Sequence, residues 1–266
     1  MNKTTIYNQF DDEDIHDNPS IEKEYYYMDV TMSDGNIITR KSNGFTLLMK
    51  LVLLTKMHKK AISLIEELLS ANPDTIDQRN NKGLTALMIA VCNVDTCSTE
   101  NTVKLLIDMG ANVNLQDNRL SSTLGYAQLN KGDSIFEMLI NEGVNVNFQD
   151  INGESVLMST VTYVGNLGKI KLLIDAGADI NLQTKGGETA LMMVCERQIY
   201  DGGIIIQLLI NNGADINLKN NNGKTAFMLI LDNIHYKKYE EDVIYNIFKP
   251  FIDAKFNSIY IKKATK

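Results

Sequence analysis

The sequence predicts an all-α fold: a solenoid of stacked helix-turn-helix units with β-hairpin-like finger loops between them. Two motifs that return with the same period predict it, together with an apolar pair that precedes each return. The first motif reads GANVN at residues 110–114, GVNVN at 143–147, and GADIN at both 177–181 and 213–217. The steps between copies are 33, 34 and 36 residues. A period in this range is typical of repeat proteins, in which each unit buries its apolar face against its neighbours.

The second motif keeps the same period and predicts where each unit begins. It reads GFTLLM at 44–49, GLTALM at 83–88, GESVLM at 153–158, GETALM at 187–192 and GKTAFM at 223–228. The Thr or Ser in each copy is an N-cap, because its oxygen accepts hydrogen bonds from the exposed N–H groups of the first helical turn. A degenerate copy, LSSTLG, occupies 120–125, where the period requires one.

Each unit holds two short amphipathic helices. In the second unit, Leu87 and Val91 share one helical stripe, and Val103 and Leu106 follow at helical spacing on the second helix. That helix ends at Gly110, a residue suited to the left-handed conformation after a helix C-terminus. Extra residues lengthen some units between their two helices, at 93–100 and 198–203.

One unit departs from the pattern, and we expect it to be the least stable full unit. Leu120 occupies the position of the turn glycine, and Gly125 falls inside the expected first helix. A glycine inside a helix costs about 1 kcal/mol relative to alanine.

These motifs resemble those of the ankyrin repeat family over residues 41–257. The Gly-x-Thr-Ala-Leu-Met starts and the Leu-Ile-x-x-Gly-Ala-Asp-Ile-Asn ends carry the resemblance. Methionine at 88, 158, 192 and 228 replaces the histidine of the family, so the hydrogen bond of that histidine at the helix start is lost. The composition is rich in Asn and poor in Pro, and TALM stands in place of Thr-Pro-Leu-His. In both respects the sequence resembles ankyrin proteins of large DNA viruses that infect amoebae.

The period divides the chain into eight segments. They are an acidic disordered tail with an N-terminal capping segment (1–40), a divergent repeat 1 (41–79), repeat 2 (80–116), a degenerate repeat 3 (117–149), repeat 4 (150–183), repeat 5 (184–219), a divergent C-terminal capping repeat (220–257) and a basic tail (258–266). Near the ends we expect a short helix at 21–32, a tight turn at 33–36 and a polar insertion at 232–242. A helical stretch at 243–252, interrupted by Pro250, completes the cap.

Composition and charge exclude several functional classes. Hydrophobic residues make up 44% and charged residues 22%, which is ordinary for a soluble protein with a buried core. The formal net charge of -7 argues against nucleic-acid binding, which needs a surplus of Lys and Arg. No apolar run has the roughly 18 residues of a membrane span, and no signal peptide is recognisable. We therefore expect a soluble, intracellular protein of the cytoplasm, or of the host cytoplasm if it is viral, that neither binds membranes nor is secreted.

No residue pattern indicates catalysis, a cofactor or a metal site. The three histidines, His16, His58 and His235, are far apart in a linear solenoid. Cys92 and Cys97 are five residues apart, and the simplest interpretation is two small apolar side chains beside an insertion, with a metal-binding or reactive pair as the alternative. The prediction is a protein that is not an enzyme.

The asparagines that close the first motif form a further candidate set: Asn114, Asn147, Asn181 and Asn217. The simplest interpretation is structural, with each side chain bonding its own backbone where the extended segment begins. The family resemblance implies another, because asparagine at this place can be hydroxylated by an oxygen-dependent asparaginyl hydroxylase. Both interpretations stay open.

The resemblance also implies where a partner would bind: on a concave face formed by the finger tips and the first helix of each unit. Carried over by register, the candidate residues are Arg119, Tyr126, Ile151, Glu154, Tyr163, Lys185, Glu188, Met193 and Arg197. A wider set of expected exposed positions includes Leu84, Ile89 and Leu229. Arg and Tyr are enriched at binding hot spots, so Arg119, Tyr126, Tyr163 and Arg197 are the strongest candidates.

We therefore expect a monomeric, non-catalytic protein that binds one or more proteins through its concave face, as an adaptor acting on host proteins if the viral resemblance holds. Two alternatives stay open. One is a regulatory subunit of an enzyme complex whose partner supplies the activity, and the other is a structural module with no dedicated partner.

Overall fold

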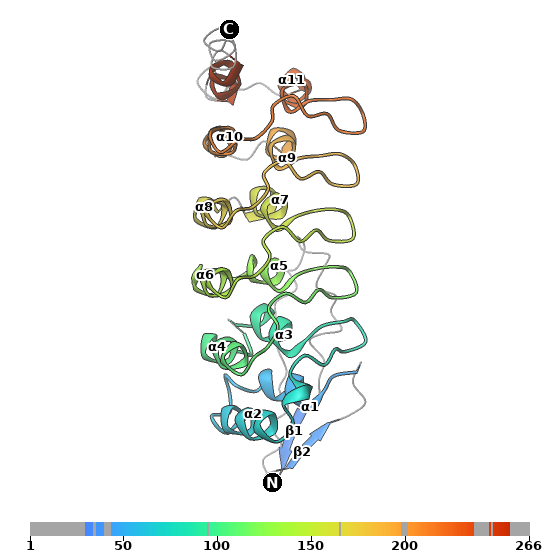
Figure 1. Ribbon diagram of the computed structural model, residues 1–266, viewed down its shortest axis with the longest axis vertical. Helices are drawn as coiled ribbons and strands as arrows, with labels where there is room; N and C mark the ends of the chain where they lie inside the picture. The colour runs from blue at the N-terminus through green and yellow to red at the C-terminus, as the bar shows by residue number, and fades with distance from the viewer. Residues whose placement is uncertain are drawn as a thin grey trace.

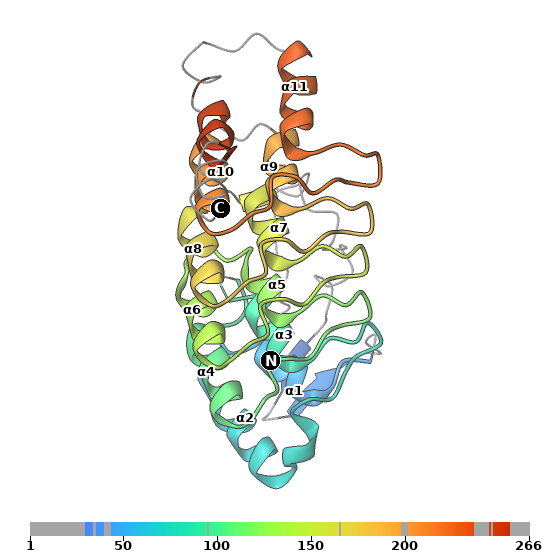
Figure 2. The same cartoon turned by 45° about the horizontal axis from the view of Figure 1, so that its top comes forward.

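The computed structural model describes residues 30–33, 36–39, 44–94, 96–164, 166–197, 202–236, 245 and 247–255. Within this part of the chain the helices form one elongated stack, two helices deep, and loops project from one of its sides (Figures 1 and 2). We call these loops the fingers. The predicted helical solenoid with hairpin-like loops is confirmed.

Each unit gives one helix to an inner column beside the fingers and one to an outer column (Figure 1). The inner column contains α1 (Leu47–Val52), α3 (Ala86–Cys92), α5 (Thr123–Ala127), α7 (Val156–Ser159) with the π-helical turn η3 (Thr160–Val164), α9 (Ala190–Arg197) and α11 (Ala226–Tyr236). The outer column contains α2 (Lys60–Ala71), followed by the 3₁₀ turn η2 (Pro73–Thr75), then α4 (Glu100–Asp108), α6 (Ser134–Asn141), α8 (Leu167–Asp175) and α10 (Gly202–Asn211).

A hydroxyl side chain caps each inner helix. The caps are Thr46, Thr85, Ser122, Ser155, Thr189 and Thr225, and each accepts from the backbone N–H three residues further on. The predicted N-caps are thereby confirmed. Each cap satisfies one of the N–H groups that the first turn of a helix leaves without an intrahelical partner.

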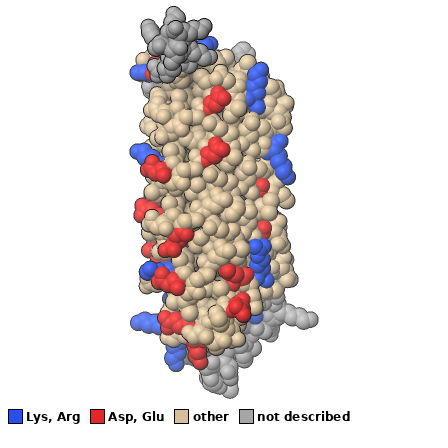
Figure 3. Space-filling view, in the orientation of Figure 1, with Lys and Arg blue, Asp and Glu red and all other residues tan. Residues whose placement is uncertain are grey.

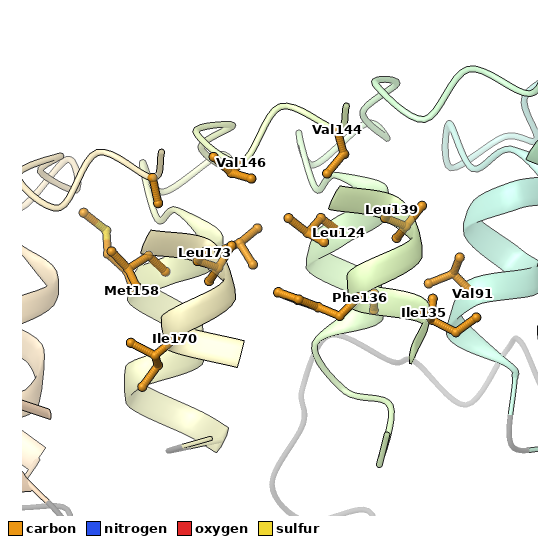
Figure 4. Close-up of a cluster of buried hydrophobic side chains, with 14 of the residues drawn as sticks. Val91, Leu124, Ile135, Phe136, Leu139, Val144, Val146, Met158, Ile170 and Leu173 are labelled. Carbon is orange, nitrogen blue, oxygen red and sulfur yellow. The ribbon is translucent and has the colours of Figure 1, made fainter. Parts of the chain in front are cut away.

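The core is a continuous apolar layer between the two columns. Leu124 of α5 and Leu139 of α6 are both fully buried, and Met158 of α7 lies against Ile170 and Leu173 of α8 in the same unit. Figure 4 shows groups of buried side chains from successive units, one beside the next, along this layer. No unit could bury these residues alone, so stacking supplies most of the stability.

The methionines at the histidine position serve mainly as core residues. Met88, Met158 and Met192 are at most 1% exposed. The sulfur of Met158 also accepts from the backbone N–H of Ser155 at 3.4 Å, so in this unit a weak contact replaces the hydrogen bond that the sequence predicts to be lost.

The last inner helix is less covered than the others. Phe227, Met228 and Leu231 of α11 are 36%, 47% and 47% exposed, whereas the matching residues of α9, Leu191, Met192 and Cys195, are buried. The Phe227 ring packs edge-on against Phe248 and Phe251, with centroids 5.3 and 5.7 Å apart. The exposure of α11 follows from its place at the end of the described stack.

The N-terminal end corrects one expectation. β1 (Val30–Ser33) and β2 (Asn36–Thr39) pair as an antiparallel hairpin, so a helix reaching residue 32 is wrong. β-branched residues are frequent in both strands (Val30, Thr31, Ile37, Ile38 and Thr39), and the Asp-Gly dipeptide between them strongly favours a hairpin turn over a helix. Ser33 pairs with Asn36 at the ends of the predicted turn, and residues 34–35 lie outside the described part. Residues 1–29, with the expected acidic tail, lie outside the described residues.

The C-terminal end corrects two more. α11 continues to Tyr236, so residues 232–236 are helical and not part of a polar insertion. No glycine or proline interrupts the sequence there, and Lys224 Nζ binds Asp232 Oδ2 at 2.7 Å. Residues 247–255 are helical on both sides of Pro250, so the proline does not interrupt this helix, which Phe248 and Phe251 hold against α11. Residues 237–244 and 256–266 lie outside the described part.

Leu120 retains the turn that glycine makes in the other units. Its φ is 60°, and in the described part it is the only residue other than glycine with a positive φ. Gly153 and Gly187, at the matching positions, have φ values of 78° and 82°. An L-residue in this conformation is strained by about 1–2 kcal/mol, and the half-exposed Leu120 side chain contributes little burial in return.

Replacing Leu120 with glycine should therefore stabilise the protein. For Leu120→Gly we expect the free energy of unfolding, measured by urea titration, to rise by about 0.5–1 kcal/mol, which is the relieved strain less the extra chain entropy of glycine. Gly187→Leu is the matched control and should destabilise strongly, because a Cβ at Gly187 would lie 2.8 Å from the Asn221 backbone nitrogen. A loss of stability in Leu120→Gly would contradict the strain argument.

Candidate functional site

The finger tips form a hydrogen-bonded row along one edge of the stack. The bonds run from the N–H of Asn118 to the carbonyl of Lys82 (3.0 Å), from Ile151 to Arg119 (2.9 Å), from Lys185 to Asn152 (2.9 Å) and from Asn221 to Gly186 (2.9 Å). Backbone bonds fix the separation of neighbouring tips. The backbone positions from which the tip side chains project therefore form a regular row.

Inside each finger one polar side chain shapes the turn. Asp117 Oδ1 accepts from the backbone N–H groups of Arg119 and Ser121, and Asp150 Oδ1 accepts in the same way from Asn152 and Glu154. These acceptors consume backbone donors that would otherwise lack partners in a tight turn. The side chains of Asp117 and Asp150 thus stabilise the turn of their own finger.

The closing asparagines bond the next unit, which corrects the prediction that they bond their own backbone. Asn147 Oδ1 accepts from the N–H of Asp179 at 2.7 Å, and its Nδ2 donates to the carbonyl of Gly177 at 3.3 Å. Asn114 and Asn181 make the same pair of contacts one unit before and one unit after. Asn217, at the end of the series, donates to Asp215 of its own finger.

We call this series the asparagine ladder. It connects neighbouring units at three successive boundaries, at the end of the fingers nearest the helices. The sequence analysis did not predict these contacts between units, because the partners of each asparagine lie some 30 residues further along the chain. Hydroxylation of these residues stays a prediction, and it would require an enzyme to reach side chains whose amide groups are already bonded.

The candidate residues fall into three groups. Arg119, Ile151 and Lys185 are exposed at the finger tips, while Tyr126, Glu154, Glu188 and Met193 are half-buried on the fingers and inner helices. Tyr163 lies in η3 and Arg197 ends α9, but their side chains are outside the described part. The tips and inner helices are adjacent, so the described candidates share the finger side of the stack (Figures 1 and 2).

Three positions from the wider set are wrong. Leu84, Ile89 and Leu229 are 5%, 4% and 8% exposed and belong to the core cluster. Transfer by register treated every variable position as exposed, whereas apolar side chains at these places turn inward.

Tyr126 and Glu188 have partners within their own units. The Tyr126 hydroxyl donates to Asp117 Oδ2 at 2.6 Å. This bond connects the Tyr126 side chain on α5 to the finger of the same unit. Glu188 accepts from the Thr184 hydroxyl, which itself accepts from two N–H groups of the finger turn. These contacts limit side-chain motion, so the two residues are already ordered before any partner binds.

The middle of the inner column contains an element that the sequence prediction missed. α7 continues directly into the π-helical turn η3, where Thr162 Oγ1 contacts Met193 Sδ of the next unit at 3.6 Å. A π-helical turn accommodates one extra residue and is frequent at functional sites. The only sequence signal is the 24-residue spacing from Gly153 to Gly177, one residue more than the regular 23.

A buried lysine, also missed by the sequence prediction, anchors the loop that follows α5. The Lys169 side chain on α8 is 1% exposed, and its Nζ donates to the carbonyls of Gln128 (3.0 Å) and Asn130 (2.6 Å). Asp133 Oδ1 lies 4.0 Å away, and the Phe136 ring centroid lies 5.6 Å away. Burial lowers the pKa of Lys169, and the Asp133 charge opposes that shift.

Lys169→Met should destabilise the protein by about 1–3 kcal/mol at pH 7, because two carbonyls would lose their donor. The lowered pKa of Lys169 in the folded state also predicts a pH dependence. At pH values between this pKa and the ordinary value of 10.5, Lys169 binds its proton more strongly in the unfolded chain than in the folded protein. In that window the stability of the wild type should rise with pH relative to Lys169→Met.

Urea midpoints of both proteins at pH 7, 9 and 10 test this prediction. Lys171→Met, which changes an exposed lysine on the same helix, is the control and should change stability by less than about 0.5 kcal/mol. A Lys169→Met variant as stable as the wild type at every pH would show that the lysine anchors nothing.

The described residues hold no group of three or more His, Cys, Asp or Glu side chains placed to bind a metal ion. Burial raises the pKa of Cys92 to about 11 and that of Cys195 still further, which disfavours a reactive thiolate at either position. None of the helices described is both long enough and apolar enough to cross a membrane.

Comparison with solved structures supports the architecture. EF0377, an ankyrin repeat protein, superposes with a TM-score of 0.61 at 26% identity, covering 76% of this chain and 96% of that one. A chain from the structure of the Bd0816 predatory endopeptidase of Bdellovibrio bacteriovorus in complex with immunity protein Bd3460 gives a TM-score of 0.60 at 22% identity. It covers 77% of this chain and 98% of its own, and at this identity it shows the fold alone.

Sequence comparison identifies relatives in a virus of amoebae. Ankyrin repeat proteins L122 and L91 of Acanthamoeba polyphaga mimivirus are 41% identical over 76 residues and 35% identical over 100 residues. These matches cover 29% and 36% of this chain but only 12% and 15% of the two relatives, which are far longer.

The family model "Ankyrin repeats (3 copies)" matches residues 29–117, 124–200 and 157–240. The matched residues cover most of the chain and include both repeated motifs. Members of this family are generally non-catalytic interaction modules. The chain belongs to the ankyrin repeat family.

Proposed function

We propose that this protein binds one or more partner proteins through its concave face and catalyses no reaction itself. The observation that carries the proposal is the row of finger tips. Backbone bonds between neighbouring tips fix the spacing of the backbone that carries the exposed side chains of Arg119, Ile151 and Lys185. A surface that is ordered before binding loses less conformational entropy when a partner docks.

The composition of the face suits a protein partner. Arg119 and Lys185 offer cationic groups, Ile151 is an exposed apolar side chain, and Tyr126 lies just behind the tips on α5. Interfaces combine apolar anchors with arginine and tyrosine hot spots in this way. The candidate Tyr163 belongs to the π-helical turn η3 of the same inner column, and the candidates Met193 and Arg197 belong to α9, the next helix of that column.

The viral relatives make the class of partner more specific. We infer an adaptor that acts, as a monomer in the host cytoplasm, on proteins of an amoebal host, since the relatives L122 and L91 belong to a virus of Acanthamoeba. A chain of similar fold occurs in the structure of an endopeptidase with its immunity protein, which is a precedent for this fold within a protein complex.

A paired pull-down from amoeba lysate tests the proposal. The wild type is compared with a variant that carries Arg119→Ala, Tyr126→Ala, Tyr163→Ala and Arg197→Ala, and bound proteins are identified by mass spectrometry. Truncation of one true hot spot costs about 2 kcal/mol or more, which is roughly a 30-fold weaker affinity. We therefore expect a partner that the wild type enriches and the variant does not.

A matched control variant changes exposed charges of the outer column: Lys104→Ala, Glu137→Ala, Glu142→Ala and Lys171→Ala. It should capture the same partner as the wild type, and circular dichroism must show all three proteins equally folded. Partners that survive the concave-face variant but not the outer-column variant would place binding on the wrong side of the stack. Enzyme activity in the captured fraction would favour the regulatory-subunit alternative.

A further inference from the structure

Two neighbouring finger tips carry large apolar side chains at positions where the other tips carry none. Each tip is a four-residue turn, closed by a bond from the N–H of its fourth residue to the carbonyl of its first, and these turns cover 80–83, 117–120, 150–153, 184–187 and 220–223. Leu120 and Ile151 are the large apolar residues in these turns, and their side chains are 47% and 48% exposed. We call these two residues the tip pair.

Both members of the tip pair depart from the repeat. The turn of the third unit ends in Leu120, whereas the other turns end in glycine. Ile151 is the second residue of its turn, and at that position the other units have a polar residue: Asn81, Asn118, Lys185 and Asn221. The turn therefore forms without an apolar residue at either position.

The two departures lie side by side. The N–H of Ile151 donates to the carbonyl of Arg119, the residue before Leu120, at 2.9 Å. The matching glycine of the next unit shows the direction of a side chain at position 120, because a Cβ at Gly153 would lie 2.8 Å from the backbone nitrogen of Lys185. By the same register, the Cβ of Leu120 is directed toward Ile151.

Leucine is an unfavourable residue at this position. Its φ of 60° lies in the left-handed region, which strains a residue that has a Cβ. A side chain that stays half-exposed gains little hydrophobic stabilisation in return. Backbone strain of this kind concentrates at functional sites. The strain at Leu120 therefore points to a role for its exposed side chain in recognition.

The surroundings of the tip pair favour an apolar contact over an ionic one. The charged residues of the two turns are Asp117, Arg119 and Asp150, so neither sign dominates, and both acids accept hydrogen bonds within their own turns. Figure 3 shows uncharged surface between the charged side chains along the margin where the fingers project in Figure 1. Removal of apolar surface from water is the main driving force available at such a place.

We propose that the tip pair is the apolar anchor of the partner-binding surface and takes one large aliphatic or aromatic side chain from an otherwise polar segment of the partner. This inference rests on the proposed function and names the chemistry that the surface recognises. The polar character of the segment follows from the neighbouring tip residues Asn118, Asn152 and Lys185, because an apolar centre with a polar rim is the usual composition of an interface. Glycine at position 120 would relieve the strain but would remove half of the anchor.

Peptide selection tests the anchor with a defined probe. A phage-displayed library of random peptides is selected on the full chain, and in parallel on a double variant with Leu120→Gly and Ile151→Asn, which gives both turns the residues of the other units. Peptides enriched on the wild type are synthesised, and their affinities are measured by fluorescence polarisation. We expect them to share one large apolar residue. Affinity should fall at least tenfold in either single variant, and equally when that peptide residue is replaced with alanine.

Three variants of the protein serve as controls. Leu120→Gly is expected to be more stable than the wild type, so a loss of affinity in this variant cannot come from unfolding. Leu120→Met keeps an apolar side chain and should bind within threefold of the wild type. Ile204→Ser removes an apolar side chain that is 57% exposed on α10, in the outer column, and should leave the affinity unchanged.

Four results would overturn the proposal. They are equal affinity of the peptides for the wild type and for Leu120→Gly, enriched peptides without a shared apolar residue, an equal loss of affinity in Ile204→Ser, and a selection that enriches no more peptides on the wild type than on the double variant. The pull-down separates these failures from a failure of the proposed function. A partner that the concave-face variant loses and Leu120→Gly retains would leave the proposed function in place and remove the anchor, whereas a pull-down without partner would count against the proposed function.

Discussion

Contact between neighbouring units is the interaction on which the rest of this structure depends. Each unit has only two short helices, and five-residue α5 or four-residue α7 would not persist in isolation. The buried layer of Figure 4 supplies the apolar part of the contact, and the asparagine ladder and the tip-to-tip backbone bonds supply the polar part. Stability in such a stack is close to a sum of unit and interface terms, so one weak unit survives when its interfaces are good.

The unit around α5 illustrates this dependence. Leu120 strains its turn, Gly125 lowers the helix propensity of α5, and the helix is short. Its neighbours compensate: Lys169 of α8 reaches back to the carbonyls that follow α5, and Asn114 binds the backbone of the following unit. The same unit provides Arg119 and Tyr126 to the proposed binding surface. The position of this unit in the proposed binding surface therefore depends on contacts with the units on both sides. The same contacts keep the finger tips in register.

The sequence predicted the parts of the fold that repeat. Glycine at the turn, hydroxyl caps such as Thr85 and apolar stripes recur with the period, so each copy supports the others. It failed where a feature occurs once or depends on distant residues. Lys169 has no periodic signal, the hairpin of β1 and β2 lies outside the repeats, and the partners of Asn147 lie in the next unit. The candidate face was predicted by register alone, and that is why Leu84 and Ile89 were misplaced: register gives the position of a residue in its unit, while packing against neighbouring helices decides whether an apolar side chain there is buried.

Amide hydrogen exchange at the asparagine ladder tests the central claim most directly. The N–H groups of Asn145, Asp179 and Asp215 belong to exposed residues and donate to the asparagine side chains of the preceding unit. If contacts between units hold the finger row in place, these amides exchange slowly, and Asn147→Ala accelerates exchange at Asp179 well before it affects amides inside α3. Exchange at the rate of an unfolded chain in the wild type, or no response to Asn147→Ala, would contradict the account.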